Sequence, residues 1–206
     1  MQFFPEGYLL HSPENIAATR SPAALAEAAR QGAILEARAA LCDSAHNLIL
    51  DLPGVRAVIP REEGALGIRE GTVRDIAILS RVNRPVCFTV TRVEEDGAGG
   101  YLATLSRRAA QERCMAEYIA ALAPGDVIPA RVTHLESFGV FADIGCGISS
   151  LLPIDAISVS RIEHPRERFL PGMDIRALVK SKENRRVTLT HKELLGTWEE
   201  NAARFR

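Results

Sequence analysis

The 206-residue sequence lacks the features of membrane-spanning, secreted and metal-binding proteins. No apolar run reaches the roughly 18 residues of a membrane-spanning helix, and no basic segment followed by a long apolar run opens the chain. The four cysteines, Cys42, Cys87, Cys114 and Cys146, form no Cys-x-x-Cys pair. We therefore expect buried free thiols, no metal or redox site and no cofactor, in a soluble cytoplasmic protein.

The sequence also has no excess of charge of either sign. Its 25 Lys and Arg side chains nearly cancel its 26 Asp and Glu side chains, which argues against a strongly basic protein that binds nucleic acid without specificity. Any electrostatic surface must therefore be local. Residues 161–192 carry nine Lys and Arg against four Asp and Glu, a net of +5, whereas residues 33–105 carry eight Arg against ten Asp and Glu, a net of −2.

No catalytic arrangement is recognisable. The five histidines have no ligand-like spacing, and no glycine-rich loop leads from a strand into a helix in the pattern that cradles phosphates. Ser149, Ser150, Ser158 and Ser160 have no evident base partner in the sequence. We expect a protein that is not an enzyme.

Two sets of five short alternating segments, separated by Gly, Pro, Asn and charged residues, predict two small barrels. In the segment 47–52, for example, Leu48 and Leu50 share one face while Ile49 and Asp51 share the other. The ten strands are predicted at 33–41, 47–52, 55–59, 85–93 and 101–106, and then at 126–136, 138–145, 148–153, 173–181 and 185–190.

Helical patterns lie before and between the two sets. Ser21 and Pro22 suit the cap and first position of a helix that Gly32 ends. Residues 1–20 are expected to form an extended arm whose aromatics pack against the first barrel. Ser106 is placed to cap a connecting helix over 107–122.

A last helix is expected after the second set. Thr190 and Glu193 fit a capping box, which predicts a helix from about 191 to 205. Trp198 on that helix is expected to pack rather than to bind a ligand.

The two sets are related by an internal repeat. Leu50-Asp51-Leu52 corresponds to Ala142-Asp143-Ile144 at an offset of 92 residues, and Ile59-Pro60 corresponds to Leu152-Pro153 at an offset of 93. This near constancy predicts a duplicated domain. The copies differ at one pair of positions, because Phe138 and Phe141 of the second copy align with His46 and Ile49 of the first.

The stretch from Gly125 to Lys192 resembles the S1 RNA-binding domain, an OB-fold module of bacterial translation and RNA metabolism. The resemblance rests on Ser137-Phe138-Gly139-Val140-Phe141-Ala142-Asp143, on Leu151-Leu152-Pro153, on Pro171-Gly172-Met173-Asp174 and on Arg186-Val187-Thr188-Leu189. The whole chain is similar to a shortened bacterial homologue of ribosomal protein S1. That family strings S1 domains in tandem and binds messenger RNA at the small ribosomal subunit.

The resemblance implies a mainly β fold with connecting helices and two tandem five-stranded OB-fold barrels of S1 type, the first degenerate. The domains expected are an arm and helix at 1–31, a degenerate S1-like barrel at 32–106, a connector helix at 107–123, an S1 RNA-binding domain at 124–191 and a C-terminal helix at 192–206.

The resemblance also implies an RNA-binding site in the second barrel. Residues three apart in a regular strand point to opposite faces, so without a distortion one of Phe138 and Phe141 lies in the core. On residue type alone we favour a core position for both. A bulge or bend at Gly139 can re-aim Phe138, and the S1 pattern implies that the pair lies on the RNA face. Arg186 matches the family's RNA-contacting arginine, and His134 occupies a position that is often polar or basic.

Two usual contacts of the family are absent. Pro153 stands where S1 domains often have a histidine, and Lys182 stands near the position of an aspartate in the last hairpin. Lys180, Lys182 and Arg185 either compensate through phosphate contacts or form a solvated hairpin tip.

Two hypotheses for function follow. The first is a non-catalytic protein that binds single-stranded messenger RNA through the second S1 domain, associated with the ribosome and with no membrane partner. The alternative is a protein-interaction or ribosome-docking module that kept the fold and has weak or no affinity for RNA.

Overall fold

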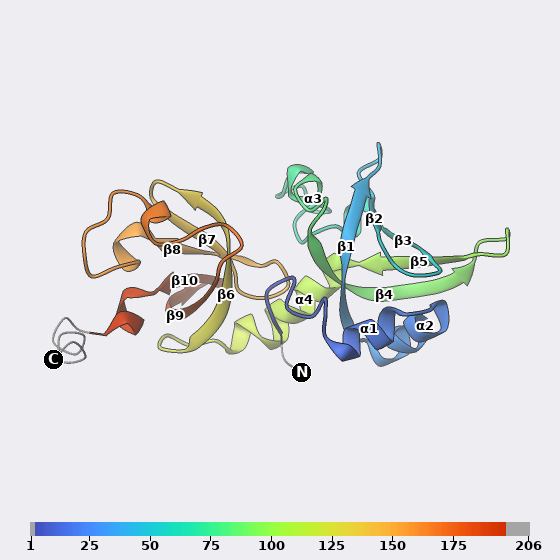
Figure 1. Ribbon diagram of the computed structural model, residues 1–206, viewed down its shortest axis with the longest axis horizontal. Coiled ribbons are helices and arrows are strands. Elements are labelled where there is room, and N and C mark those ends of the chain that lie inside the picture. The colour runs from blue at the N-terminus through green and yellow to red at the C-terminus, as the bar shows by residue number, and fades with distance from the viewer. Residues whose placement is uncertain (1–2, 197–206) are drawn as a thin grey trace. The chain divides into compact units, whose positions relative to one another are not determined.

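The computed structural model describes residues 3–196, and the chain divides into two compact units (Figure 1). One unit is Glu6–Cys114, and the other consists of Met1–Pro5 and Met115–Arg206. Each unit holds one closed five-stranded barrel. Among residues 3–196, none of the helices combines the length and the apolar character needed to span a bilayer.

The first barrel closes in the strand order β1-β2-β3-β5-β4. All neighbours are antiparallel except β3 and β5, which run parallel. Alternate side chains point inward, so Leu48, Ile59, Phe88 and Leu105 are fully buried. The strands are β1 (Ile34–Cys42), β2 (Leu48–Leu50), β3 (Arg56–Ile59), β4 (Pro85–Glu95) and β5 (Tyr101–Ser106).

The second barrel has the same order and the same single parallel pair, here between β8 and β10. Val140, Leu152, Val179 and Leu189 fill its interior. The strands are β6 (Val127–Glu136), β7 (Gly139–Asp143), β8 (Ser149–Pro153), β9 (Asp174–Glu183) and β10 (Arg186–Thr190). The predicted fold of two five-stranded barrels is confirmed; the domain boundaries themselves stay a prediction.

The two barrels share their irregularities as well as their strand order. The pairing of β1 with β2 shifts between Ala39 and Leu41, and that of β6 with β7 shifts between Val132 and His134. A second shift separates Val90 from Arg92 in β4, and β9 has its counterpart between Val179 and Ser181. Bulges are specific local features of a strand, so their repetition supports the predicted duplication.

A short helix corrects the expectation of an extended arm over residues 1–20. The helix α1 (Pro13–Thr19) begins at Ser12, whose hydroxyl accepts the backbone N–H of Asn15 at 3.2 Å. Ser12-Pro13 is the same cap and first-turn pair that predicts the next helix. The side chain of Asn15 anchors α1 to β1, because its amide donates to the carbonyl of Glu36 at 2.9 Å and its oxygen accepts the N–H of Glu36 at 2.8 Å.

The next helix, α2 (Pro22–Gln31), has the predicted ends. The Ser21 hydroxyl accepts the N–H of Ala24 at 3.1 Å, and Gly32 closes the helix at a φ of 62°. Leu25 and Ala28 are buried against the barrel. Phe3 and Phe4 belong to the other unit, where the Phe3 ring stacks on Tyr118 at 6.1 Å and the Phe4 carbonyl accepts the N–H of Cys146 at 2.9 Å.

The segment between β3 and β4 contains a 3₁₀ turn, Arg61–Glu63, and the short helix α3 (Ile76–Leu79). After β5, the helix α4 (Arg107–Glu117) has the predicted cap, since the Ser106 hydroxyl accepts the N–H of Ala109 at 2.9 Å. A 3₁₀ turn, Ile119–Ala121, follows it.

The described part of the predicted last helix is a 3₁₀ turn, Lys192–Leu195. The expected capping box is not formed, because the Thr190 hydroxyl donates to the carboxylate of Glu193 instead of accepting a backbone N–H. The remainder of that predicted helix, with Trp198, lies outside the described residues.

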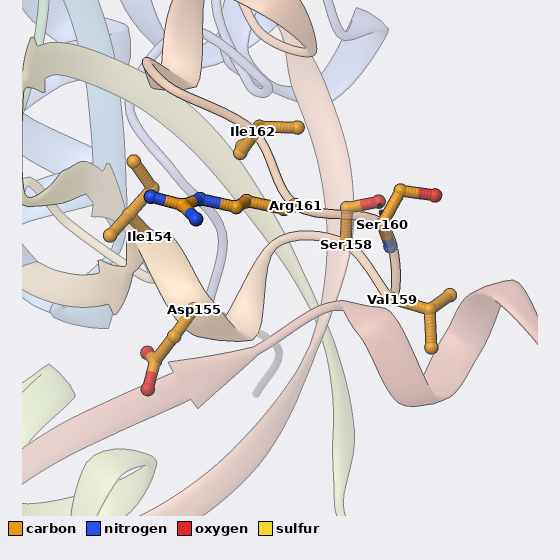
Figure 2. Close-up of a pocket in the computed structure, with 7 residues that line it drawn as sticks. All are labelled: Ile154, Asp155, Ser158, Val159, Ser160, Arg161 and Ile162. Atoms are coloured by element: carbon orange, nitrogen blue, oxygen red, sulfur yellow. Dashed lines mark hydrogen bonds between the residues drawn. The ribbon is translucent and has the colours of Figure 1, made fainter.

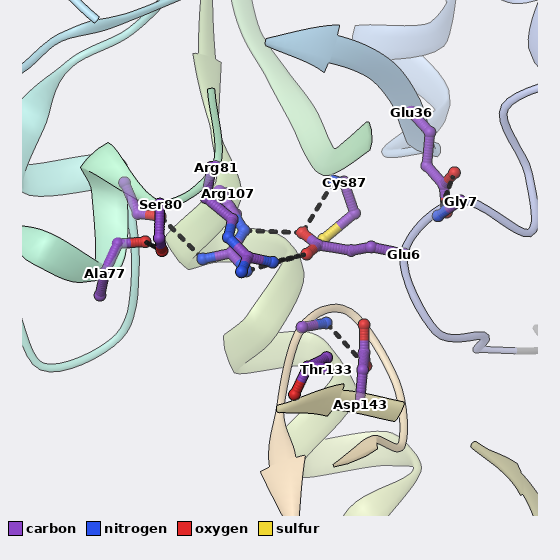
Figure 3. A network of polar contacts seen from close by, with 12 residues as sticks. Glu6, Gly7, Glu36, Ala77, Ser80, Arg81, Cys87, Arg107, Thr133 and Asp143 are labelled. Atoms are coloured by element: carbon purple, nitrogen blue, oxygen red, sulfur yellow. Dashed lines mark hydrogen bonds and ion pairs between the residues drawn. The ribbon is translucent and has the colours of Figure 1, made fainter. Parts of the chain in front are cut away.

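A buried ion pair holds the start of the first unit to its last helix (Figure 3). The Glu6 carboxylate accepts from Arg107 at 2.6 and 3.0 Å and from the N–H of Cys87 at 3.0 Å, and Arg81 lies 3.5 Å away. Burial alone raises the pKa of the Glu6 carboxyl, but Arg107, Arg81 and the N–H of Cys87 together hold that pKa below its ordinary value. The carboxylate therefore stays ionised in the folded unit.

We predict that Glu6→Gln lowers the free energy of unfolding of the first unit by about 3–5 kcal/mol, because Arg107 then keeps a buried charge without its partner. Urea unfolding followed by circular dichroism measures this loss. Glu95→Gln, an exposed carboxylate at the end of β4, is the matched control. An unchanged urea midpoint in Glu6→Gln contradicts the prediction.

The same pair makes a pH-dependent contribution. Since the pKa of Glu6 is lowered in the folded state, its stabilisation is fully present above about pH 4.3, the ordinary value for glutamate, and is lost as the pH falls through the folded value. Glu6→Gln should therefore lose less stability than the wild type on acidification below that pH.

Candidate nucleic-acid interface

Phe138 lies in a two-residue turn and not in a regular strand. Ser137 and Phe138 join β6 to β7, and Glu136 and Gly139 pair across the base of the turn. The alternation rule that sets Phe138 and Phe141 on opposite faces therefore does not apply to this pair. The Phe138 side chain is 53% exposed, so the preference for a core position based on residue type alone is wrong for this residue.

Gly139 has a different role from the strand-bending one expected of it. A Cβ at this position would lie 2.5 Å from the carbonyl oxygen of Leu152 and 3.1 Å from the Cα of Pro153. Glycine thus allows β7 to approach β8 closely as it leaves the turn. Phe138 is re-aimed by the turn itself.

The bulge in β6 turns His134 outward. Val132 points into the core and pairs with Ala142, so a regular strand would also point His134 inward. The extra residue Thr133, whose hydroxyl donates to the carbonyl of Phe141 at 3.1 Å, reverses the alternation. His134 then lies directly opposite Phe141 on the outer face.

His134, Phe141 and Phe138 form a continuous row of rings, here called the aromatic strip. The rings of His134 and Phe141 are 6.4 Å apart with an interplanar angle of 23°, and those of Phe141 and Phe138 are 6.1 Å apart at 86°. The side chain of His134 is 63% exposed and Phe141 is half-buried. The strip therefore presents ring surface to solvent at both ends.

Glu136 is a neighbour of the strip that sequence reasoning missed. Its carboxylate lies 2.7 Å from Nε2 of His134. The spacing of the two residues could have predicted this contact, since residues two apart on a strand share a face. The contact orients the imidazole and places a negative charge beside it. This position suits stacking by His134 better than a phosphate contact.

The outer row continues from the strip across the barrel to Arg186. Phe141 pairs with Leu151, and Leu151 pairs with Thr188 of β10. Arg186 lies two residues before Thr188, so its exposed side chain shares this outer face. The register thus places the predicted arginine and the predicted aromatics on one surface.

The predicted cations of the last hairpin differ in their surroundings. Lys180 is the extra residue of the β9 bulge and is exposed. Arg185 is exposed in the two-residue turn between β9 and β10, where Asn184 and Arg185 have φ of 49° and 66°. Positive φ at both positions is the geometry of a type I′ turn, which favours Asn-Gly.

Lys182 is engaged within its own unit. Its ammonium donates to the carbonyl of Ala120 at 2.6 Å and lies 3.5 Å from that of Ile119. It also pairs with the inward-facing Val187, which directs it away from the face of Thr188. Its predicted contact with RNA stays a prediction.

The equivalent face of the first barrel is aliphatic. The shared bulges and pairings align Leu41 with His134, Ile49 with Phe141 and Val58 with Leu151. Leu41 is 49% exposed. No ring lies on this row, so stacking on bases is not available there.

His46, the counterpart of Phe138, makes local polar contacts. Its Nδ1 lies 2.5 Å from Oδ2 of Asp75, and Arg61 donates to both oxygens of that carboxylate at 2.9 and 2.7 Å. Hydrogen bonds from Arg61 and His46 hold the pKa of Asp75 below its usual range. The contact between His46 and Asp75 joins the loop between β1 and β2 to the residue that precedes α3.

The described residues offer no group of three or more His, Cys, Asp or Glu side chains arranged to hold a metal ion. All four cysteines are free thiols. Three of them are buried, whereas Cys42 is half-buried, which corrects the expectation of four buried thiols. Burial, with the charges of Asp43 and Asp75, raises the pKa of Cys42, so its thiol is poorly reactive at neutral pH.

Comparison with known proteins matches residues 121–192 to the family described as the S1 RNA binding domain. The chain is 32% identical over 152 residues to the small ribosomal subunit protein bS1 of Rhodopseudomonas palustris, covering 71% of this chain and 25% of that protein. It is 31% identical over 116 residues to bS1 of Staphylococcus aureus strain COL, covering 53% of this chain and 29% of that protein. The chain thus spans about a quarter of the length of these relatives.

Among solved structures, the chain is similar to a multidomain protein with nucleic acid binding domains from Streptococcus pneumoniae, with a TM-score of 0.32 and 15% identity over 82% of this chain and 58% of the other. It is also similar to GSP13 from Bacillus subtilis, with a TM-score of 0.35 and 17% identity over 37% of this chain and 60% of the other.

We predict that Arg185→Gly stabilises the second barrel by about 0.5–1 kcal/mol. Glycine removes the cost of a left-handed backbone at this turn, and the greater conformational entropy of glycine in the unfolded chain offsets part of that gain. Thermal unfolding measures the gain. Arg185→Ala removes the same charge but keeps a Cβ, so it should bring no such gain. Equal stability of the two variants contradicts the prediction.

Proposed function

We propose that this chain, whose residues 121–192 match the S1 RNA binding domain family, holds single-stranded RNA on the aromatic strip and catalyses no reaction. The observation that carries the proposal is the row of rings from His134 through Phe141 to Phe138, exposed at both ends. OB-fold barrels bind single strands by stacking bases on such rings.

Stacking supplies most of the affinity in this proposal. Each base stacked on an aromatic ring contributes about 1–3 kcal/mol, and every base has a face to stack, so little sequence preference is expected from the strip. His134 adds a third ring whose orientation Glu136 fixes. Single-stranded RNA fits this surface better than a duplex, whose bases are already stacked on one another.

Phosphate contacts supply a smaller share. Arg186 lies on the same outer face as the strip, and Lys180 and Arg185 are exposed near it along β9 and β10. With three such contacts, the slope of log K against log salt should be about −2, since each contact to a single strand contributes about −0.7. The local net charge of +5 over residues 161–192 agrees with a modest effect of this kind.

The similarity to small ribosomal subunit proteins extends the proposal to translation. We infer that the bound strand is messenger RNA and that the chain acts in the cytoplasm at the small ribosomal subunit.

We predict that Phe138→Ala combined with Phe141→Ala weakens binding of a short single-stranded RNA by at least about 30-fold, since two stacking contacts of about 1 kcal/mol or more are lost. Fluorescence anisotropy with a labelled oligonucleotide across a salt series measures the change. The salt slope should stay the same, because no cation is removed.

Two controls sharpen this test. Tyr101→Ala removes an aromatic that is 40% exposed on the first barrel and should leave affinity unchanged. Phe138→Leu with Phe141→Leu keeps apolar volume but no ring, and should still lose affinity. Wild-type affinity in the double alanine variant, with circular dichroism unchanged, excludes the aromatic strip as the RNA site.

A second candidate function belongs to the first barrel: docking onto a protein of the small ribosomal subunit. The aliphatic row of Leu41, Ile49 and Val58 replaces the ring positions, and Ile76 and Leu79 of α3 are 65% and 41% exposed. Contiguous exposed apolar surface is typical of protein contacts. The similarity to small ribosomal subunit proteins supports a partner of this class.

Leu41→Asp with Ile76→Asp should then reduce co-sedimentation with purified small ribosomal subunits at least about fivefold, while binding of free RNA is unchanged. Ile16→Asp, a side chain 54% exposed on α1, is the control for added charge. Full co-sedimentation by the double aspartate variant rejects this docking face.

A further inference from the structure

An open cavity of about 320 Å³ is lined by residues of the connection that follows β8 (Figure 2). It lies in the connection after β8, and the first residue of its lining, Ile154, donates its N–H to the carbonyl of Phe138 at 2.9 Å. The hydrogen bond makes the cavity the immediate neighbour of the turn that carries Phe138. A strand that stacks along the strip and leaves Phe138 on the side of Ile154 would reach this cavity.

The lining has the chemistry to receive one nucleotide. Ile154, Val159 and Ile162 supply apolar surface, and Asp155, Ser158, Ser160 and Arg161 supply polar groups, of which Asp155 is acidic and Arg161 basic. The volume is at the lower end of the range of ligand pockets, about 300–1,000 Å³, and so suits a single nucleotide rather than a folded RNA element.

Arg161 is the group that distinguishes this cavity from a simple apolar hollow. Its guanidinium extends toward Ile154, and the carboxylate of Asp155 points away from it (Figure 2). Within the described chain Arg161 is exposed and has no ion-pair partner. A guanidinium group stacks on a base or pairs with a phosphate, and Arg161 can make either contact with a nucleotide in this cavity.

The serines complete the polar side of the cavity. The hydroxyl of Ser158 accepts the N–H of Ser160 at 3.2 Å, which shapes the loop and leaves its own proton to donate. The Ser160 side chain is exposed at the rim. Hydroxyls at this position can donate to phosphate or ribose oxygens.

We propose that this cavity is a nucleotide subsite that extends the RNA path beyond Phe138. The nucleotide next to the one stacked on Phe138 enters it, with its base against Ile154 and Ile162 and beside the Arg161 guanidinium. The inference rests on the proposed RNA-binding function, and it adds a contact that only a strand longer than the strip can make.

A length series tests the proposal. Labelled oligouridines of about 3 and about 6–8 nucleotides, within the range that one OB fold accommodates, are titrated into the full chain by fluorescence anisotropy. Arg161→Ala should weaken binding of the longer strand about fivefold or more and leave the short strand unchanged. The double Phe→Ala variant should weaken both.

Arg166→Ala is the matched control, because Arg166 is an exposed arginine of the same connection that does not line the cavity. Equal losses in Arg161→Ala and Arg166→Ala, or equal losses for both strand lengths, overturn the subsite. Binding of both lengths by wild type with no change in Arg161→Ala also overturns it. No binding of either strand by wild type defeats the proposed function itself.

Cross-linking locates the contact directly. A photoreactive base placed at either end of the longer strand should give an adduct on the peptide containing residues 154–162 from one end, detected by mass spectrometry. Uridine monophosphate alone should not compete with the longer strand at matched concentration, since it lacks the stacked neighbours. Competition by the mononucleotide, or adducts on that peptide from neither end, overturns an extended RNA path.

Discussion

One extra residue in β6 determines which side chains the second barrel presents to a ligand. Val132 points inward, and a regular strand would bury His134 beside it. Thr133 adds a residue to β6 without a counterpart on β7, so every position after it changes face. The aromatic strip exists because this bulge and the turn at Phe138 place three rings on one side.

The first barrel shows that the backbone alone does not produce an aromatic strip. It has the same bulge, between Ala39 and Leu41, and the bulge likewise turns a side chain outward. That side chain is Leu41, and its neighbour across the pair is Ile49. One scaffold therefore supports two surfaces, and the choice between rings and aliphatic side chains at a few outward positions separates them.

The sequence predicts the strands within a few residues because their alternation and their turn residues agree. It predicts α2 and the start of α4 from their caps. The helix α1 escaped prediction although Ser12-Pro13 has the same form as Ser21-Pro22, since its seven residues offer little apolar periodicity. The predicted capping box at Thr190 was wrong for the opposite reason: its residues are present in the sequence, but the Thr190 hydroxyl donates to the Glu193 side chain.

The candidate site was less predictable than the fold. Strand alternation argued against a shared face for Phe138 and Phe141, and the two-residue turn that holds Phe138 removes that objection. The contact of Lys182 with the carbonyl of Ala120 joins residues 62 positions apart, and the cavity depends on how the connection after β8 folds back. Neither long-range contacts nor loop shape are encoded in local periodicity.

The pairing of Glu6 with Arg107 has a consequence for the order of folding. The two residues are 101 positions apart, so closing the loop between them carries an entropic cost before the contact forms. During synthesis the carboxylate emerges long before its partner and remains hydrated, because domains fold as units from the N-terminus. The ion pair with Arg107 therefore forms only when the chain has grown into α4, and shorter nascent chains offer Glu6 the guanidinium of Arg81 but not that of Arg107.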